Sequence, residues 1–156
     1  DLGCGAGNVT QLLTSRWPDA CITGIDSSEE MIAEARKTAS PIQWQTQSIA
    51  DWTAATPANV IFSNAALHWL PDHQTLFPHL MDQLASGGAL AVQIPRNFGE
   101  PSHTLIWETV DSGAWKSRFD HLPRTSPVSQ PHFYYNLLVP DALIIDIWEI
   151  QYLQVL

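Results

Sequence analysis

The sequence has few cysteines, few basic residues and no long apolar run. Its 156 residues include only Cys4 and Cys21, too few for a disulfide framework or a cysteine metal site. Seven Lys and Arg face 16 Asp and Glu, and this net charge of −9 argues against a nucleic-acid partner. No apolar run approaches the ~20 residues of a membrane span. We therefore expect one cytoplasmic domain, with no metal, membrane or nucleic-acid partner.

Both ends of the sequence are unusual for a complete domain. The chain begins at Asp1 without an initiator methionine, and it stops inside the apolar stretch 152–156. Only two residues precede a glycine motif that ordinarily follows a whole strand. We therefore expect a partial domain, truncated at both termini, whose central strand is nearly absent.

The most informative motif lies at the start of the chain. Asp1 is followed by Gly3, Gly5 and Gly7 in alternation with other residues. Glycine lets a backbone turn sharply or a ligand approach closely, because it has no Cβ. The dinucleotide fingerprint G-x-G-x-x-G requires a third glycine at the position that Asn8 occupies, so a nicotinamide cofactor is disfavoured. The pattern indicates a different ligand at the start of a helix.

Alternating apolar and helical patterns predict an α/β fold with a mostly parallel, doubly wound sheet. The expected strands cover residues 21–26, 42–48, 59–63, 89–94 and 142–154. The expected helices cover residues 8–16, 27–37, 76–84, 102–115 and 134–138. Gly87 and Gly88 are expected to end the third of these helices. Ligands of such sheets bind at the carboxyl ends of the strands, where Asp26 ends the first expected strand.

Several longer strings resemble the trans-aconitate 2-methyltransferases. The motif Asp-x-Gly-x-Gly-x-Gly is similar to motif I of enzymes that use S-adenosylmethionine (SAM), and by itself it indicates only a methyltransferase. More specific are residues 64–73 (NAALHWLPDH) and 93–103 (QIPRNFGEPSH). Further matching strings are residues 16–18, 22–28, 31–36, 76–80, 90–95 and 146–148. The resemblance implies a Rossmann-like class I fold, with a cofactor-binding half at 1–95 and a substrate-side segment at 96–156.

The resemblance also implies the cofactor SAM and the residues that bind it. They are Asp1, Gly3, Gly5, Gly7, Asp26, Ser27, Met31, Ser48, Ile49 and Asn64. Asp26 would take the ribose hydroxyls. Ser48 stands where the family usually has an acid for the adenine amino group. Its hydroxyl can accept a hydrogen bond without the charge, so we expect weaker SAM binding.

The implied reaction is methyl esterification of a small polycarboxylate. A carboxylate is ionised at neutral pH, so we expect no catalytic acid or base, only alignment and desolvation. The substrate-positioning candidates are His68, Trp69, Arg96, His103, Tyr134 and Tyr135. Arg96 suits a carboxylate because its planar guanidinium binds in a bidentate manner. Each candidate also has a plain alternative, as a surface arginine, a packed histidine or a core aromatic residue.

Three other functions compete with this interpretation. One is a methyltransferase for another small acid or for a malonyl-carrier-protein thioester. An acidic carrier protein would require a basic surface patch, which a chain of net charge −9 does not obviously offer. Another is a SAM-binding module without catalysis, which Ser48 favours and Asp1, Asp26 and Asn64 disfavour. The third, a nicotinamide oxidoreductase, is disfavoured by the glycine spacing.

Overall fold

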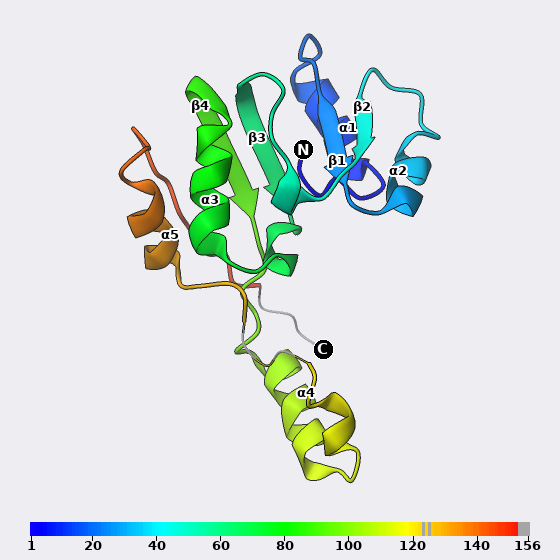
Figure 1. Cartoon of the computed structure of the whole chain (residues 1–156), viewed down its shortest axis with the longest axis vertical. Coiled ribbons are helices and arrows are strands. Elements are labelled where there is room, and N and C mark those ends of the chain that lie inside the picture. Colours follow the sequence, from blue (N-terminus) through cyan, green and yellow to red (C-terminus); the bar gives the residue numbers. More distant parts are fainter. Residues whose placement is uncertain (123, 125, 153–156) are drawn as a thin grey trace.

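The computed structural model describes residues 1–122, 124 and 126–152. Strands and helices alternate along the first 93 residues, and helices follow (Figure 1). The strands are β1 (Thr23–Asp26), β2 (Gln43–Thr46), β3 (Ala58–Asn64) and β4 (Leu84–Gln93). The helices are α1 (Asn8–Arg16), α2 (Glu29–Ala35), α3 (His73–Asp82), α4 (Pro101–Ser112) and α5 (Pro131–Leu138), with short 3-10 turns η1 (Ile49–Asp51), η2 (Leu67–Trp69) and η3 (Lys116–Phe119). Among these described helices, none is long and apolar enough to cross a membrane.

The strands form two parallel pairs, β1 with β2 and β3 with β4. The first residues of the chain join the pairs. The Leu2 backbone N–H donates to the Phe62 carbonyl of β3 at 2.8 Å, and Leu2 forms a parallel bridge with Ile25 of β1. Residues 1–3 therefore occupy the place of the central strand, and the predicted parallel sheet is confirmed.

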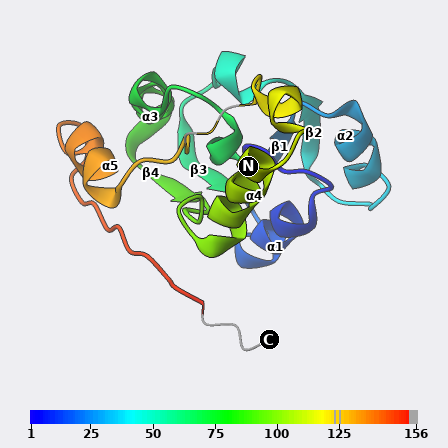
Figure 2. The same cartoon turned by 90° about the horizontal axis from the view of Figure 1, so that it is seen from below.

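Helices lie on both sides of the strands, with α1 and α3 on opposite faces (Figure 2). The core lies between β3, the bridging residues and α3. Its buried members are Leu2, Ile25, Ile49, Ile61, Leu67, Leu76, Phe77, Leu80, Val128 and Tyr134. The helical spacing of Leu76, Phe77 and Leu80 gives α3 one apolar face, which explains its packing. All four strand arrows point toward the end of the molecule from which α4 projects (Figure 1).

The glycine pair at 87 and 88 does not end a helix as predicted. Helix α3 stops at Asp82, and β4 begins at Leu84 and includes both glycines. The register with β3 shifts here, because Ala58 pairs with Leu84 whereas Val60 pairs with Ala89. Gly87 has φ +76°, a conformation that glycine adopts without strain. The two glycines thus serve an irregularity inside the strand.

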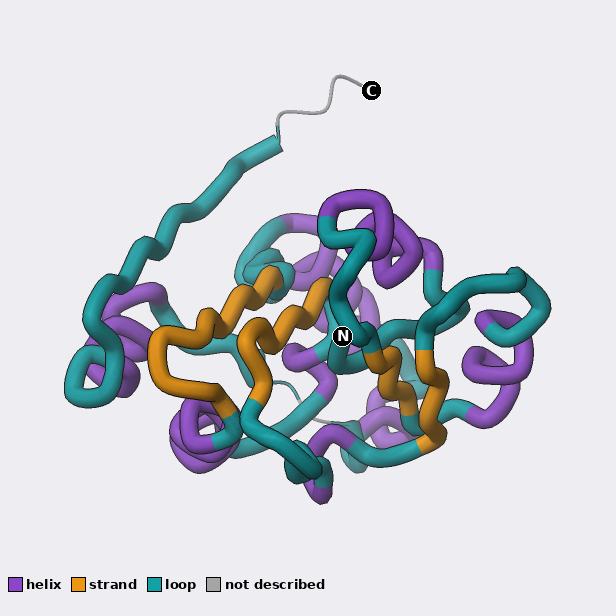
Figure 3. The backbone as a smooth tube through the Cα atoms, turned by 90° about the horizontal axis from the view of Figure 1, so that it is seen from above, coloured by secondary structure: helices purple, strands orange, loops and turns teal. Residues whose placement is uncertain are grey.

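The predicted strand at 142–154 is wrong for the part that the structure describes, residues 142–152; its last two residues lie outside the described ones. No strand is assigned there, and the segment runs extended away from the sheet (Figure 3). Leu143 is 97% exposed and Ile144 88%. Apolar alternation gives a strand only where a neighbouring strand takes its backbone hydrogen bonds, and no described strand lies beside this segment.

Candidate active site

The glycine loop links residues 1–3 to α1 and lies at the carboxyl edge of the strands. Gly3, Gly5 and Gly7 have φ values of +74°, +53° and +82°, a region that side chains with a Cβ rarely adopt. A Cβ on Gly3 would overlap the Cβ of Ala66, in the segment after β3. A Cβ on Gly5 would meet nothing within 4 Å. The loop is therefore packed at Gly3 and open at Gly5.

Sequence reasoning missed the role of Trp44 on β2. Its indole ring lies where a Cβ on Gly7 or on Gly24 would be, so both positions must be glycine for the ring to fit. Gly7 is the N-cap of α1, and its third-glycine role in the motif thus includes packing against a strand 37 residues later. Nothing in the local pattern around Trp44 indicates this contact.

The Asp26 carboxylate holds the loop. Its Oδ2 accepts from the Gly5 backbone N–H at 2.8 Å, and its Oδ1 accepts from the Ser28 N–H at 2.9 Å. Asp26 thus fixes the open part of the loop to the start of α2. Because each carboxylate oxygen can accept more than one hydrogen bond, ribose hydroxyls can bind without displacing these N–H groups.

Asp1 is held by a residue that the sequence analysis did not single out. The Thr10 hydroxyl on α1 donates to Asp1 Oδ2 at 2.5 Å, and the Thr10 residue is fully buried. The contact turns a carboxylate of the motif toward the first helix. Its one sequence signal is a small polar residue three positions after Gly7, on the helix that the loop begins.

The other proposed cofactor residues lie at or near the ends of the strands, with different exposures. The Ser48 hydroxyl accepts from the Ala50 N–H at 3.2 Å and caps η1, while the Ile49 side chain is part of the core. Asn64 ends β3 and is exposed. Ser27 and Met31 are also exposed, beside the Asp26 anchor at the start of α2.

His68 and Trp69 lie in η2, directly after β3, and differ sharply in exposure. His68 is 7% exposed, whereas Trp69 is 79% exposed. Their rings are tilted against each other with centroids 4.6 Å apart. Burial first, and then the neighbouring His73, lower the pKa of His68, so its imidazole is neutral at pH 7. The structure therefore offers one enclosed histidine and one open aromatic surface after β3.

Arg96 follows β4 and pairs with a carboxylate of the chain itself. Its Nε–H donates to Glu149 Oε2 at 2.5 Å, and this hydrogen bond raises the pKa of Arg96 and lowers that of Glu149. A ligand carboxylate would use the remaining guanidinium N–H groups. His103 lies on α4, where its ring packs against Phe98 with centroids 5.0 Å apart.

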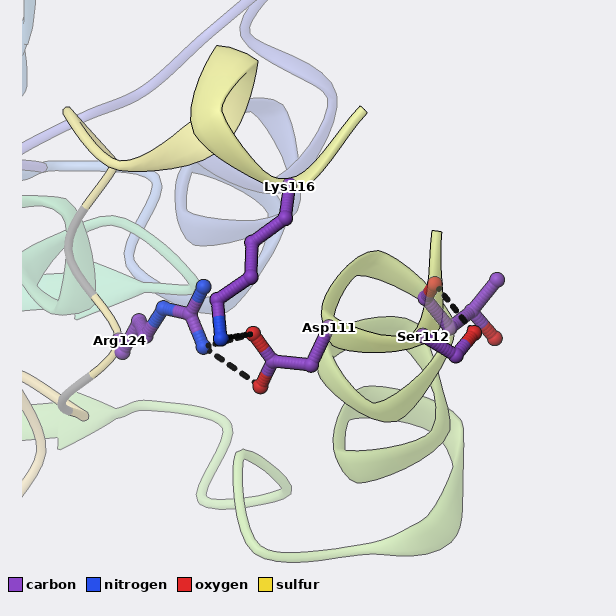
Figure 4. Close-up of polar contacts among 5 residues, drawn as sticks. Asp111, Ser112, Lys116 and Arg124 are labelled. Atoms are coloured by element: carbon purple, nitrogen blue, oxygen red, sulfur yellow. Dashed lines mark hydrogen bonds and ion pairs between the residues drawn. The ribbon is translucent and has the colours of Figure 1, made fainter. Parts of the chain in front are cut away.

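Arg124 belongs to a charged cluster (Figure 4). Arg124 Nη1 donates to both Asp111 carboxylate oxygens at 2.8 and 3.0 Å, and Lys116 Nζ lies 3.1 Å from Asp111 Oδ1. Hydrogen bonds from Arg124 and Lys116 lower the pKa of Asp111. Arg124 also lies over the Trp107 ring, 4.7 Å from its centroid. The cluster ties α4 to the segment that returns from it.

Tyr134 is not available as the predicted carboxylate donor in this structure. It is buried in the core, and its hydroxyl oxygen lies 2.7 Å from His73 Nδ1 and accepts from the Ser129 N–H at 3.1 Å. His73 Nε2 lies 2.9 Å from the Leu67 carbonyl, which can only accept. His73 Nε2–H therefore donates to the Leu67 carbonyl, and in the neutral ring Nδ1 accepts from the Tyr134 hydroxyl. Tyr135, in contrast, is 48% exposed on α5.

Replacing Tyr134 by phenylalanine is expected to destabilise the fold. The change leaves His73 Nδ1 and the Ser129 N–H without their partner, and an unsatisfied buried group costs about 1–3 kcal/mol. Urea unfolding of Tyr134→Phe measures the loss, with the exposed Tyr135→Phe as the matched control. Equal stability of the two variants would contradict the network.

The family described as methyltransferase domain matches residues 1–88, more than half of the chain. The chain belongs to this family. In the described residues, no group of three or more His, Cys, Asp or Glu side chains is arranged to hold a metal ion.

Curated methyltransferases and solved structures agree with the family. The chain is 44% identical over all of its length to the trans-aconitate 2-methyltransferase of Azoarcus sp. (strain BH72), and 47% identical over 97% of its length to that of Escherichia coli O7:K1. It spans 61% and 58% of those two proteins. The plantazolicin methyltransferase BpumL, solved with SAH, superposes with a TM-score of 0.66 at 20% identity, covering 90% of this chain and 53% of BpumL. The class I methyltransferase fold is thus confirmed.

Proposed function

We propose that the protein is a SAM-dependent methyltransferase that forms a methyl ester on trans-aconitate. The observation that carries the proposal is the Asp26 carboxylate that anchors the open Gly5 loop at the carboxyl edge of a parallel sheet. The identity of 44–47% to trans-aconitate 2-methyltransferases supports this acceptor.

The residues at the loop fit SAM. Space at Gly5 admits a ligand against the backbone, and Asp26 retains lone pairs for two ribose hydroxyls. Asp1, held by Thr10, supplies a carboxylate for a cationic amino group. Bound SAM supplies an electrophilic methyl group. Ser27, Met31, Ser48, Ile49 and Asn64 complete the proposed cofactor site.

The chain's own task toward the acceptor is alignment. An ionised carboxylate needs no general base, so the site must hold one oxygen in line with the methyl group and exclude water. Arg96, with its remaining N–H groups, and His68 are the donors proposed for the acceptor's carboxylates. Trp69, His103 and Tyr135 are proposed to line the acceptor side.

The proposal divides the chain at residue 95. Residues 1–95 carry all the proposed cofactor residues, and 96–156 carry Arg96, His103 and Tyr135 on the acceptor side. A cytoplasmic location is part of the proposal, and the two free thiols, Cys4 and Cys21, suit a reducing compartment.

Methyl-labelled SAM tests the function directly. The protein is supplied with trans-aconitate, citrate, cis-aconitate and malonyl-carrier protein in parallel. Base-labile label on trans-aconitate alone is the expected result, because a carboxyl methyl ester is hydrolysed by base. Label on the carrier protein instead would replace the proposed acceptor, and SAM binding without any transfer would leave a binding module.

The Ser48→Asp substitution is expected to strengthen SAM binding severalfold. A charged acceptor for the adenine amino group contributes about 1 kcal/mol more than a neutral hydroxyl. Aspartate is also a good N-cap, so η1 is preserved. Calorimetric titration with SAM measures the change, and Ser48→Ala is the matched control, expected to bind more weakly. Equal affinity of the serine, aspartate and alanine proteins would remove Ser48 from the adenine site.

A further inference from the structure

The two ring nitrogens of His68 lie in different surroundings. Nδ1 is enclosed and has no hydrogen-bond partner within the described ranges. Nε2 also forms no hydrogen bond with a described residue, but unlike Nδ1 it is not enclosed. Nε2 is therefore the nitrogen that solvent reaches. One edge of the ring thus faces the interior and the other faces outward from η2.

This asymmetry selects a tautomer. A neutral imidazole has one N–H donor and one lone pair. A buried N–H without a partner is rare in folded proteins, and an unpaired acceptor is somewhat less rare. The proton therefore belongs on Nε2, where water or a ligand can accept it, and the lone pair belongs on the enclosed Nδ1. The lowered pKa of His68 keeps the ring in its neutral form.

We propose that His68 positions the acceptor by donating Nε2–H to a carboxylate oxygen, and that it offers no outward lone pair to an alcohol or phenol. This inference rests on the proposed function. An ionised carboxylate needs only donors, and the second oxygen of the same group remains for the methyl. A hydroxyl acceptor instead needs a base to remove its proton. The tautomer therefore selects carboxylates.

The turn η2, which carries His68, is held in place by His73 of α3. His73 Nε2–H donates to the carbonyl of Leu67, the residue before His68, and His73 Nδ1 is occupied by the Tyr134 hydroxyl. His73 therefore cannot replace His68 as a donor, because both of its nitrogens are used inside the fold. The same contacts hold η2 in one position, so the outward edge of His68 is set before the acceptor arrives.

Two amide variants separate the two ring edges. Glutamine reaches the position of Nε2, and asparagine reaches only that of Nδ1. His68→Gln is expected to keep the KM for trans-aconitate within about threefold, and His68→Asn to raise it about tenfold or more through loss of a hydrogen bond to a charged group. Neither is expected to change kcat strongly. A low KM in His68→Asn together with a high KM in His68→Gln would overturn the proposal.

Nitrogen-15 NMR of the acceptor-free protein tests the tautomer independently of activity. A proton on Nε2 of His68 at pH 7 is expected, with the signal assigned by its absence in His68→Gln. A proton on Nδ1, or a charged ring, would overturn the inference. If trans-aconitate is not methylated, only the proposed acceptor is wrong, and the proposal about His68 is tested with a panel of carboxylates and phenols. His68-dependent methyl transfer to carboxylates supports the proposal. Methyl transfer to phenols refutes it.

Discussion

Asp26→Ala abolishes measurable SAM binding, which is the largest effect that we expect on the cofactor. The substitution removes the proposed ribose acceptor and also the partner of the Gly5 and Ser28 N–H groups. Hydrogen bonds to a charged group contribute about 1.5–3 kcal/mol each, so losing two lowers affinity about 100-fold or more. Isothermal titration with SAM makes the measurement.

Asp51→Ala is the matched control for Asp26→Ala. Asp51 is an exposed acid in η1 near the carboxyl end of β2, and no described residue pairs with its carboxylate. The Asp51→Ala protein is expected to bind SAM with the affinity of the unaltered protein. Circular dichroism of both variants distinguishes loss of the site from loss of the fold. Unchanged affinity in a folded Asp26→Ala protein would show that the ribose assignment is wrong.

Gly3→Ala is expected to destabilise the fold by several kcal/mol and to prevent binding. The new Cβ would overlap Ala66, and the backbone φ of +74° adds strain. Strain of this kind costs about 1–3 kcal/mol, and overpacking typically about 1–3 kcal/mol more. Because the overlap is between backbone-attached carbons, neither side can rotate away. Urea unfolding measures the loss of stability.

Gly87→Ala separates the two causes. Gly87 has φ +76°, nearly the value of Gly3, but a Cβ there would meet nothing within 4 Å. It therefore reports the backbone strain alone. Gly99→Ala, with open space and no positive φ, reports neither. If Gly3→Ala costs no more than Gly87→Ala, the close approach to Ala66 does not hold the loop.

Local patterns were sufficient for most of the fold. The predicted helix at 8–16 coincides with α1, because the glycine loop starts it and Pro18 follows its end. The strand predicted at 59–63 lies within β3. The strand predicted at 142–154 failed over its described part, because pairing depends on a neighbour that the segment's own residues do not reveal.

The candidate site was predictable in its residue types but not in its contacts. The acid and the glycines predict a ligand loop, and in the structure the Asp26 carboxylate accepts from the Gly5 N–H of that loop. That Arg96 pairs with Glu149 depends on residues 53 positions apart. The sequence left the role of Tyr134 open, because a phenol side chain suits both a ligand site and a core. In the structure Tyr134 is buried in the core.

The indole of Trp44 makes three distant positions evolve together. A residue larger than glycine at position 24 requires a smaller ring on β2. That smaller ring would also remove the steric clash at position 7, where the backbone φ of +82° would still favour glycine. Change at any one of these positions is then selected against until a second has changed. Among descendants of this sequence, the ring size at 44 and the glycines at 7 and 24 should therefore be inherited as a set.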